Sequence, residues 1–592
     1  MKLGRVRAPI RVAGRSGFSA RAALPLVLAF AFSVTHEGVG AQNRAEALPA
    51  CEGRIVSEIA ITPRDPSFLS FPQFLRPLAR GVGLHHTTSR AEAVGSFVLL
   101  EVGEACTERQ RAESERILRL QPFLADATVR TVPDSLGGVR VEIETVDEIP
   151  TVFRMAFRGL EPSWVRFGNG NVDGRGLRLA ADVERGFAYR AGVGISATAY
   201  QAFGRPYTLS FAARRAPLGS TVSIALGRPF FTDLQRHAWH LGFSNLNRYV
   251  RFSPPDGDAP SLGVKRRFWD VGGVRRLGIG RYIAFAGALV TSEHVTPASR
   301  SVIVSDSGLV ADTAGVLGGP FPSFRNLRLN AVVGVRALSF RTVRGFDALA
   351  AVQDVATGVQ LGAVLGWGVP RFGDPADRAG DRLVAVDLYA GRGSATQFAG
   401  LRVESEARLD PATGRWDSMV GSGRLAWYLK PAAAHVVVGG AEFGGARRQR
   451  VPFQLMLGDP QGGVRGYGDS RSSGAVRAVF RLEERWTIGS PTEHAAFGLS
   501  TFGDAGRVWA GDAPFGTDTG TKVGLGLGLL ATFPPESPRL WRLDVAVPVS
   551  SDPHAGWEIR LTSSWTRSFW REPDDVARGR AGTAPSTSFG WP

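Results

Sequence analysis

A glycine-rich turn late in the chain carries the residues best suited to a specific polar interaction. Residues 458–468 read GDPQGGVRGYG, with five glycines, one arginine and one tyrosine. Glycine adopts backbone angles that other residues resist, so this segment can fold back tightly on itself. A loop surrounded by water would not need Arg465 and Tyr467 among those glycines. We therefore expect the loop to lie inside a barrel, where Arg465 binds a buried carboxylate.

The carboxylate expected to bind Arg465 is Asp504. Residues 497–509 read FGLSTFGDAGRVW and alternate as a β-strand does. The alternation places Phe502 and Asp504 on one face, which should point into the lumen. Gly506 leaves room for a second backbone to approach. The sequence therefore predicts a charge-assisted hydrogen bond between the loop and this strand, with no covalent chemistry.

Motifs for catalysis or cofactor binding are not found. The sequence has no GxSxG nucleophile elbow, HExxH zinc motif or phosphate-binding lysine loop in a fitting context. Residues 524–528 read GLGLG but belong to an alternating strand pattern, which argues against a nucleotide site. His85 and His86 are adjacent, so on a strand they would point in opposite directions, and no third ligand is evident. We predict no enzyme, no cofactor and no metal site.

The element that must hold the loop is a large antiparallel barrel. Residues 151–570 contain many short segments in which apolar and polar residues alternate, such as 327–336 and 401–409. Arginine facing lipid at mid-membrane would cost about 2–4 kcal/mol, so the charged faces should line the lumen. A soluble sandwich would show the same alternation. At about ten residues per strand plus loops, the region predicts a mostly β fold with about 16 transmembrane strands.

The N-terminus predicts export. Residues 1–41 combine scattered arginines, an apolar run at 22–34 and small residues at 39–41, which is typical of a secretory signal peptide. A lipoprotein signal ending at Cys51 is the alternative, although Cys51 lies well beyond the apolar run. Past this region, no segment reaches the ~18–20 apolar residues of a membrane helix. A mature membrane form must therefore be a closed barrel.

A small α+β module is expected between the signal and the barrel, at residues 51–150. Residues 54–61 alternate as a strand, and Thr107 to Gln110 fit a capping box that opens a helix. Two further strands follow at 128–132 and 139–143. Cys51 and Cys106 are the only cysteines, and whether they form a disulfide in an exported protein is left open.

The net charge of +16 first suggests nucleic-acid binding. The arginines are instead scattered at strand-like spacing rather than clustered in one run. We therefore expect no nucleic-acid partner.

Two short motifs give the chain a family resemblance. The sequence VRGY at 464–467 resembles the signature of the sixth extracellular loop in the BamA/TamA superfamily of outer-membrane assembly barrels, also called bacterial surface antigens. The sequence FGDAG at 502–506 resembles that superfamily's F-x-D-x-G strand motif, and the module at 51–150 resembles its POTRA domain. The resemblance implies an internal-loop latch and a lumenal partner motif made of Val464, Arg465, Gly466, Tyr467, Phe502, Asp504, Gly506 and Glu483.

The resemblance implies that the barrel lies in the outer membrane of a Gram-negative-type bacterium, with its N-terminal domain in the periplasm. Its partners would be membrane lipid and unfolded client proteins or periplasmic factors. Clients would be inserted or exported by strand pairing at the seam between the first and last barrel strands. The alternatives are an outer-membrane pore without assembly activity and a surface-anchored enzyme.

The chain also departs from the family's usual pattern. It has room for a single POTRA-like module, where assembly factors usually carry several. Its terminal strand, expected at 557–569 with the aromatic residues Trp557, Trp565 and Phe569, is followed by a tail. The tail at 571–592 is rich in Pro, Gly, Ser and Thr, which predicts disorder.

Overall fold

The computed structural model describes residues 51–64 and 88–580. Within this range it leaves out short segments, at 159–160, 188–189, 217, 279, 281, 306–307, 314–316, 318–320, 371–379, 411–412, 493 and 566–571. The expected signal peptide, His85, His86 and Phe569 therefore lie outside the described residues.

The N-terminal module, residues 51–147, is a three-stranded sheet with helices. Its elements are β1 (Val56–Arg64), α3 (Ala91–Gly95), α4 (Glu108–Arg119), β2 (Leu124–Pro133) and β3 (Val139–Asp147). The strand order is β1-β3-β2, with β1 parallel and β2 antiparallel to β3. Thr107 is the N-cap of α4, as expected, and its Oγ1 accepts a hydrogen bond from Gln110 N at 3.2 Å. Buried Ile117 and Leu118 then pack against the strands.

A disulfide between Cys51 and Cys106 closes this module. Their Cα atoms are 5.3 Å apart, and both side chains are fully buried. The bond joins the segment before β1 to the segment before α4, across a sequence separation of 55 residues. Because the Cys51 sulfur is bonded to Cys106, it cannot also carry the thioether-linked lipid of a lipoprotein.

Replacing both cysteines with alanine is expected to lower the free energy of unfolding of the module by about 2–4 kcal/mol, because the unfolded chain regains the freedom of a long loop. Proteolysis of the full chain in increasing urea would measure the loss. Dithiothreitol should have the same effect on the native chain and none on the variant, since the chain has only 2 cysteines. Equal resistance of the native chain with and without reductant would contradict the prediction.

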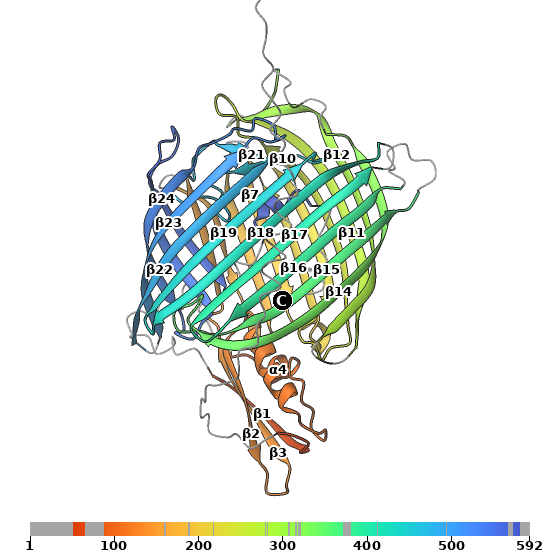
Figure 1. Ribbon diagram of the computed structural model, residues 1–592, viewed down its shortest axis with the longest axis vertical. Helices are drawn as coiled ribbons and strands as arrows, with labels where there is room; N and C mark the ends of the chain where they lie inside the picture. The colour runs from red at the N-terminus through yellow and green to blue at the C-terminus, as the bar shows by residue number, and fades with distance from the viewer. Residues whose placement is uncertain are drawn as a thin grey trace, which may run out of the picture. The chain divides into compact units, whose positions relative to one another are not determined.

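The barrel contains twenty ring strands among the described residues, and a short strand, β13 (Gly308–Ala311), extends the hairpin of β12. The ring strands are β4 (Thr151–Arg158), β5 (Glu161–Asn169), β6 (Leu177–Phe187), β7 (Arg190–Ala199), β8 (Thr208–Ala216), β9 (Gly219–Arg228), β10 (His237–Arg251), β11 (Pro260–Leu277), β12 (Ile283–Ser305), β14 (Phe324–Arg344), β15 (Val352–Gly368), β16 (Arg382–Gly393), β17 (Gln397–Asp410), β18 (Arg415–Ala432), β19 (His435–Arg447), β22 (Val476–Thr492), β23 (Ala495–Trp509), β24 (Lys522–Thr532), β25 (Arg539–Pro548) and β26 (Glu558–Trp565). Neighbours in the chain are neighbours in the ring, which closes from β26 to β4 (Figure 1).

The expected count of 16 strands is therefore wrong. The first six strands, β4 to β9, have only 8 to 11 residues each. They follow one another closely, so that residues 151–228 hold six strands. The opposite wall uses much longer strands, with 23 residues in β12 and 21 in β14. The count of 16 assumed one average strand length for the whole region, so it did not account for this difference.

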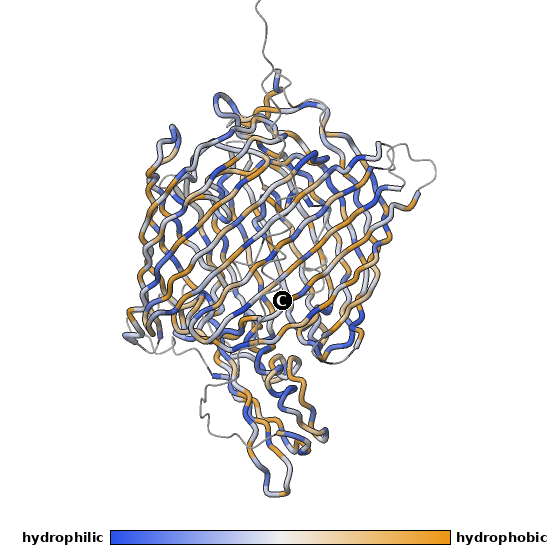
Figure 2. The backbone as a smooth tube through the Cα atoms, in the orientation of Figure 1, coloured by the Kyte–Doolittle hydropathy of each residue, from blue (hydrophilic) through white to orange (hydrophobic). Residues whose placement is uncertain are grey.

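The wall separates an apolar exterior from a charged interior. On β24, Leu525, Leu527 and Leu529 point outward and are exposed. Figure 2 shows the resulting alternation of hydrophobic and hydrophilic residues along the strands. Inside, buried charges pair with one another, as in the 2.9 Å contact between Arg328 Nη2 of β14 and Asp381 Oδ2 in the connection before β16. This pattern is the one expected where lipid meets a polar lumen.

No helix among the described residues is both long and apolar enough to cross a membrane.

Polar contacts join the N-terminal module to the barrel. Arg119 on α4 pairs with Asp354 on β15 at 3.0 Å. Glu148, in the connection between β3 and β4, accepts a hydrogen bond from Ser537 Oγ at 2.6 Å. Burial raises the pKa of Glu148 to about 7, against the opposing effects of Arg539 and Ser537.

The tail differs from the prediction of disorder. Residues 572–580 are ordered, and they include a short helix, α5 (Asp574–Ala577), with Asp575 and Val576 buried. The prediction of disorder rests on the Pro, Gly, Ser and Thr content of the tail as a whole. The partners that stabilise residues 572–580 lie far away in the sequence, on the barrel wall.

Candidate functional site

The inner loop, residues 458–468, lies between β19 and β22 and folds into the lumen. Its base is a small hairpin in which β20 (Leu455–Met456) pairs with β21 (Ser473–Gly474). Above this base, Val464 and Tyr467 are fully buried against Val479 and Val508 of the wall. Apolar contacts with the inner wall therefore hold the loop inside the barrel.

Glycine is required where the loop passes closest to other backbone. A Cβ atom on Gly458 would lie 1.7 Å from the carbonyl oxygen of Tyr467. On the wall, a Cβ atom on Gly524 of β24 would lie 2.1 Å from the carbonyl oxygen of Arg465. Real Cβ atoms do not approach so closely, so both the loop and the strand beneath it depend on glycine at these positions.

Arg465 and Asp504 form a bidentate salt bridge. Arg465 Nε donates to Asp504 Oδ2 and Nη2 donates to Oδ1, each at 2.8 Å. The backbone N of Arg465 donates to the same carboxylate at 3.2 Å. Phe502 supplies an aromatic face, with Arg465 Cζ 3.4 Å from its ring centre. Since Asp504 is almost fully buried, little water competes for these bonds.

Further charges extend the pair into a network. Arg465 Nη1 lies 3.2 Å from Asp544 Oδ2 and 3.6 Å from Glu483 Oε2. Glu483 accepts hydrogen bonds from Arg542 at 2.7 and 3.0 Å and from Arg485 at 2.6 Å. We call these residues the lumenal charge cluster, made of Arg465, Glu483, Arg485, Asp504, Arg542 and Asp544.

Arg542 and Asp544 are members that sequence reasoning missed. They are two residues apart on β25, so the strand's alternation places both on the lumenal face. That alternation was the available signal. It could show that they face inward, but not that β25 lies near the inner loop.

Tyr467 and Gly466 tie the loop to the end of the barrel sequence. The Tyr467 hydroxyl lies 3.0 Å from the carbonyl oxygen of Val523 and 2.8 Å from that of Ser550. The Gly466 N–H donates to Glu558 Oε2 at 2.8 Å. Glu558 is the first residue of β26, so the inner loop is bonded directly to the terminal strand.

The seam between β26 and β4 joins two of the shortest strands of the ring. Each has 8 residues, so fewer backbone hydrogen bonds can form there than between the long strands opposite. Arg154 on β4 donates from Nη2 to the carbonyl oxygen of Ser563 on β26 at 3.2 Å. Of the expected terminal aromatics, Trp557 lies one residue before β26 and is exposed, and Trp565 is its last residue.

A polar cavity of about 340 Å³ lies beside the loop. It is lined by members of the lumenal charge cluster and by seam residues, including Arg154 and Ser563. Among the described residues, no group of three or more histidines, cysteines or carboxylates is arranged to hold a metal ion. The cavity offers paired charges for binding polar groups, and its arginines and carboxylates are largely engaged with one another.

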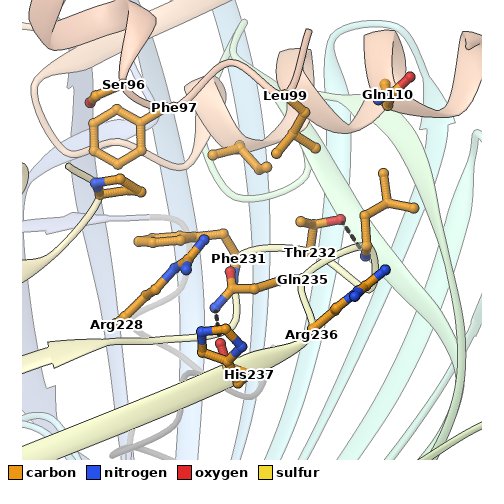
Figure 3. A pocket seen from close by; sticks show the side chains of 13 residues that line it. Ser96, Phe97, Leu99, Gln110, Arg228, Phe231, Thr232, Gln235, Arg236 and His237 are labelled. Atoms are coloured by element: carbon orange, nitrogen blue, oxygen red, sulfur yellow. Dashed lines mark hydrogen bonds between the residues drawn. The ribbon is translucent and has the colours of Figure 1, made fainter. Parts of the chain in front are cut away.

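A second cavity, of about 330 Å³, lies between the N-terminal module and the turn at 228–237. Figure 3 shows Phe97 and Leu99 of the module on one side and the side chains of this turn on the other. Phe97 and Phe231 meet edge to face, with ring centres 5.8 Å apart. The Gln235 amide donates to carbonyl oxygens of the turn itself, at 2.9 and 2.8 Å. These contacts fit a structural role.

The fold and the site together define a class of protein: a large antiparallel β-barrel whose charged lumen holds an arginine-bearing loop. No family model and no curated protein sequence matches the chain.

Among solved structures, the chain is similar to BamA from Haemophilus ducreyi lacking POTRA domains 1–3, with 11% identity and a TM-score of 0.34 over 86% of this chain and 83% of that one. It is also similar to CdiB from Escherichia coli, with 12% identity and a TM-score of 0.42 over 88% and 92% of the two chains. For CdiB from Acinetobacter baumannii the identity is 10% and the TM-score 0.36, over 87% and 74%.

Proposed function

We propose that this protein is an outer-membrane barrel that inserts or exports client polypeptides by strand pairing at the seam between β26 and β4. The observation that carries the proposal is the bond from the inner loop to the first residue of β26, Gly466 N to Glu558 Oε2, beside a seam of two 8-residue strands. Separating two short strands breaks fewer backbone hydrogen bonds than separating two long ones, so it costs less free energy. An opened strand edge presents unpaired N–H and C=O groups to a client strand.

Two further features support this reading. The VRGY and F-x-D-x-G motifs, on which the resemblance to outer-membrane assembly barrels rests, supply the two partners of the Arg465–Asp504 ion pair. The N-terminal module has the β-α-α-β-β order and an edge strand, β1, that pairs along one side with β3. On its other side, its first residue, Val56, is hydrogen-bonded to Gly103 and Glu104. We propose that the module is a periplasmic POTRA-like domain that guides unfolded clients by strand addition.

The alternative is an outer-membrane pore without assembly activity. The filled lumen disfavours it, because the inner loop and residues 572–580 occupy space that ions would need. Depletion of the protein followed by outer-membrane proteomics separates the two functions. Loss of many other barrels is expected for an assembly factor, and an unchanged set of barrels would contradict that function.

Locking the seam is expected to abolish client handling while the barrel remains folded. A bis-maleimide would link Arg154→Cys to Ser563→Cys, two positions that are in contact across the seam. The matched control links Leu527→Cys to Val545→Cys, which face each other on β24 and β25. After depletion of the native chain, the control should restore other barrels to the outer membrane and the locked seam should not. Full restoration by the locked seam would overturn the proposal.

A further inference from the structure

Residues 572–580, EPDDVARGR, occupy the lumen and contact widely separated parts of its wall. Arg266 of β11 donates from Nη2 to the carbonyl oxygen of Arg580 at 2.5 Å. Arg477 of β22 binds Asp575. Between β11 and β22 the ring passes through seven other strands, β12 and β14 to β19. A segment that reaches both must cross the interior of the barrel.

The polar contacts of this segment are specific. Arg477 Nη1 donates to Asp575 Oδ2 at 2.5 Å, and both side chains are fully or almost fully buried. Ser422 Oγ of β18 donates to Glu572 Oε1 at 2.6 Å, and Arg580 binds the same carboxylate at 2.5 and 2.7 Å. Gln461 of the inner loop exchanges two hydrogen bonds with Asp574, at 2.9 and 3.2 Å. All three carboxylates in the segment therefore have partners.

An apolar contact fixes the position of the segment. Val576 is fully buried in a cluster with Val420, Phe453 and Leu455, which belong to the wall and to the base of the inner loop. A Cβ atom on Gly444 of β19 would lie 2.8 Å from Val576 Cγ2. Only glycine leaves this space, so the wall is shaped to take an apolar side chain at this point.

The segment can also leave the wall without leaving the buried guanidinium of Arg477 unpaired. Arg477 has two other acceptors, Glu442 Oε1 at 3.2 Å and the carbonyl oxygen of Met456 at 2.8 Å. Departure of Asp575 would leave this arginine paired, whereas a buried arginine with no partner would be strongly unfavourable. The contact is thus suited to reversible binding.

We propose that the lumenal wall carries a peptide-binding site, and that residues 572–580 occupy it as a plug that closes the lumen of the barrel. The site recognises a short segment in which an acidic turn precedes a buried valine and an arginine. Ser422, Gly444 and Arg477 of the wall, together with Gln461 of the inner loop, form its recognition surface. The plug obstructs the lumen whether or not the barrel assembles clients, so this inference stands apart from the proposed function.

Peptide binding in trans tests the site. A fluorescent peptide with the sequence of residues 572–580 would be added to a chain that ends at residue 571, and its anisotropy measured. Saturable binding is expected, and the Asp575→Asn peptide should bind about tenfold more weakly, because a hydrogen bond between charged groups is lost. The full chain should not bind the peptide, since its own segment is held at a high effective concentration. Equal binding by both chains, or by both peptides, would overturn the proposal.

Conductance in planar bilayers tests the plug. The chain that ends at residue 571 should conduct several-fold more than the full chain. A chain that ends at residue 580, which retains the plug, is the matched control and should conduct like the full chain. Equal conductance of all three chains would overturn the proposal.

Two point variants keep the proposal testable should the truncated chain fail to fold. Val576→Arg in the full chain should raise conductance, because its side chain cannot enter the apolar cluster. Gly444→Cys with Val576→Cys should form a disulfide, seen by gel mobility, and hold conductance at the level of the full chain. No rise in conductance for Val576→Arg, or no disulfide in the folded double variant, would overturn the plug. None of these measurements involves a client, so a failed client assay leaves their outcome unaffected.

Discussion

Replacing Arg465 with methionine is expected to lower the free energy of unfolding of the barrel by about 3–5 kcal/mol, because the change leaves the buried Asp504 carboxylate without its partner. Methionine keeps much of the side-chain volume, so the loss reflects charge and hydrogen bonding rather than a cavity. Asp504→Asn should cost a similar amount. Urea titration of the barrel, followed by its heat-modifiable gel mobility, would measure both. Restoration of other barrels after depletion should fall in parallel, since the inner loop would no longer be held against β23.

The double variant provides the control. When both charges are removed together, neither is left buried alone. The combined loss should therefore be smaller than the sum of the two single losses by more than about 1 kcal/mol. Strictly additive losses would mean that the contact seen at 2.8 Å does not couple the two residues.

Replacing Glu483 with glutamine is the second change with a large expected effect, again about 3–5 kcal/mol of stability. Glu483 is the carboxylate on which Arg542 and Arg485 converge, and it lies 3.6 Å from Arg465. Glutamine has nearly the same shape but no charge. The positive charges of Arg465, Arg485 and Arg542 would then remain close together in a partly buried site, with one carboxylate fewer to balance them. The same urea titration would measure the loss.

Glu484→Gln is a matched control on the same strand. Glu484 is adjacent in sequence but faces the opposite side of β22, and its side chain is 55% exposed. An exposed carboxylate contributes little to stability, so this variant should change the free energy of unfolding by less than about 1 kcal/mol. Equal effects of the two glutamine variants would show that the lumenal charge cluster has no special role.

Local pattern was informative wherever the relevant contact depended on side-chain type and alternation. The position of Arg465 among glycines predicted a buried loop, and the parity of residues along 497–509 predicted that Asp504 faces inward. The structure brings these two residues into contact. The N-cap at Thr107 was predictable for the same reason, because its hydrogen bond joins residues only three positions apart.

Features that depend on how the ring of strands closes could not be predicted from the sequence. For Arg542 and Asp544, the alternation along the strand predicts only that both side chains face the lumen. Their contact with the inner loop follows from the position of β25 in the ring. The strand count failed because strand length varies around the barrel, from 8 residues at the seam to 23 in β12. Composition alone predicted a disordered tail, whereas Arg477 and the apolar side chains of Val420, Phe453 and Leu455 hold part of it in the lumen.

By itself, the sequence determined the β alternation and the two motifs whose residues form the central ion pair. These features rest on residue type and on spacings of a few positions, which local chemistry governs. Only the tertiary structure decided how many strands close the ring, which charges join Arg465 and what fills the lumen. Those outcomes depend on contacts between residues tens to hundreds of positions apart, and a linear pattern carries no information about which distant surfaces meet.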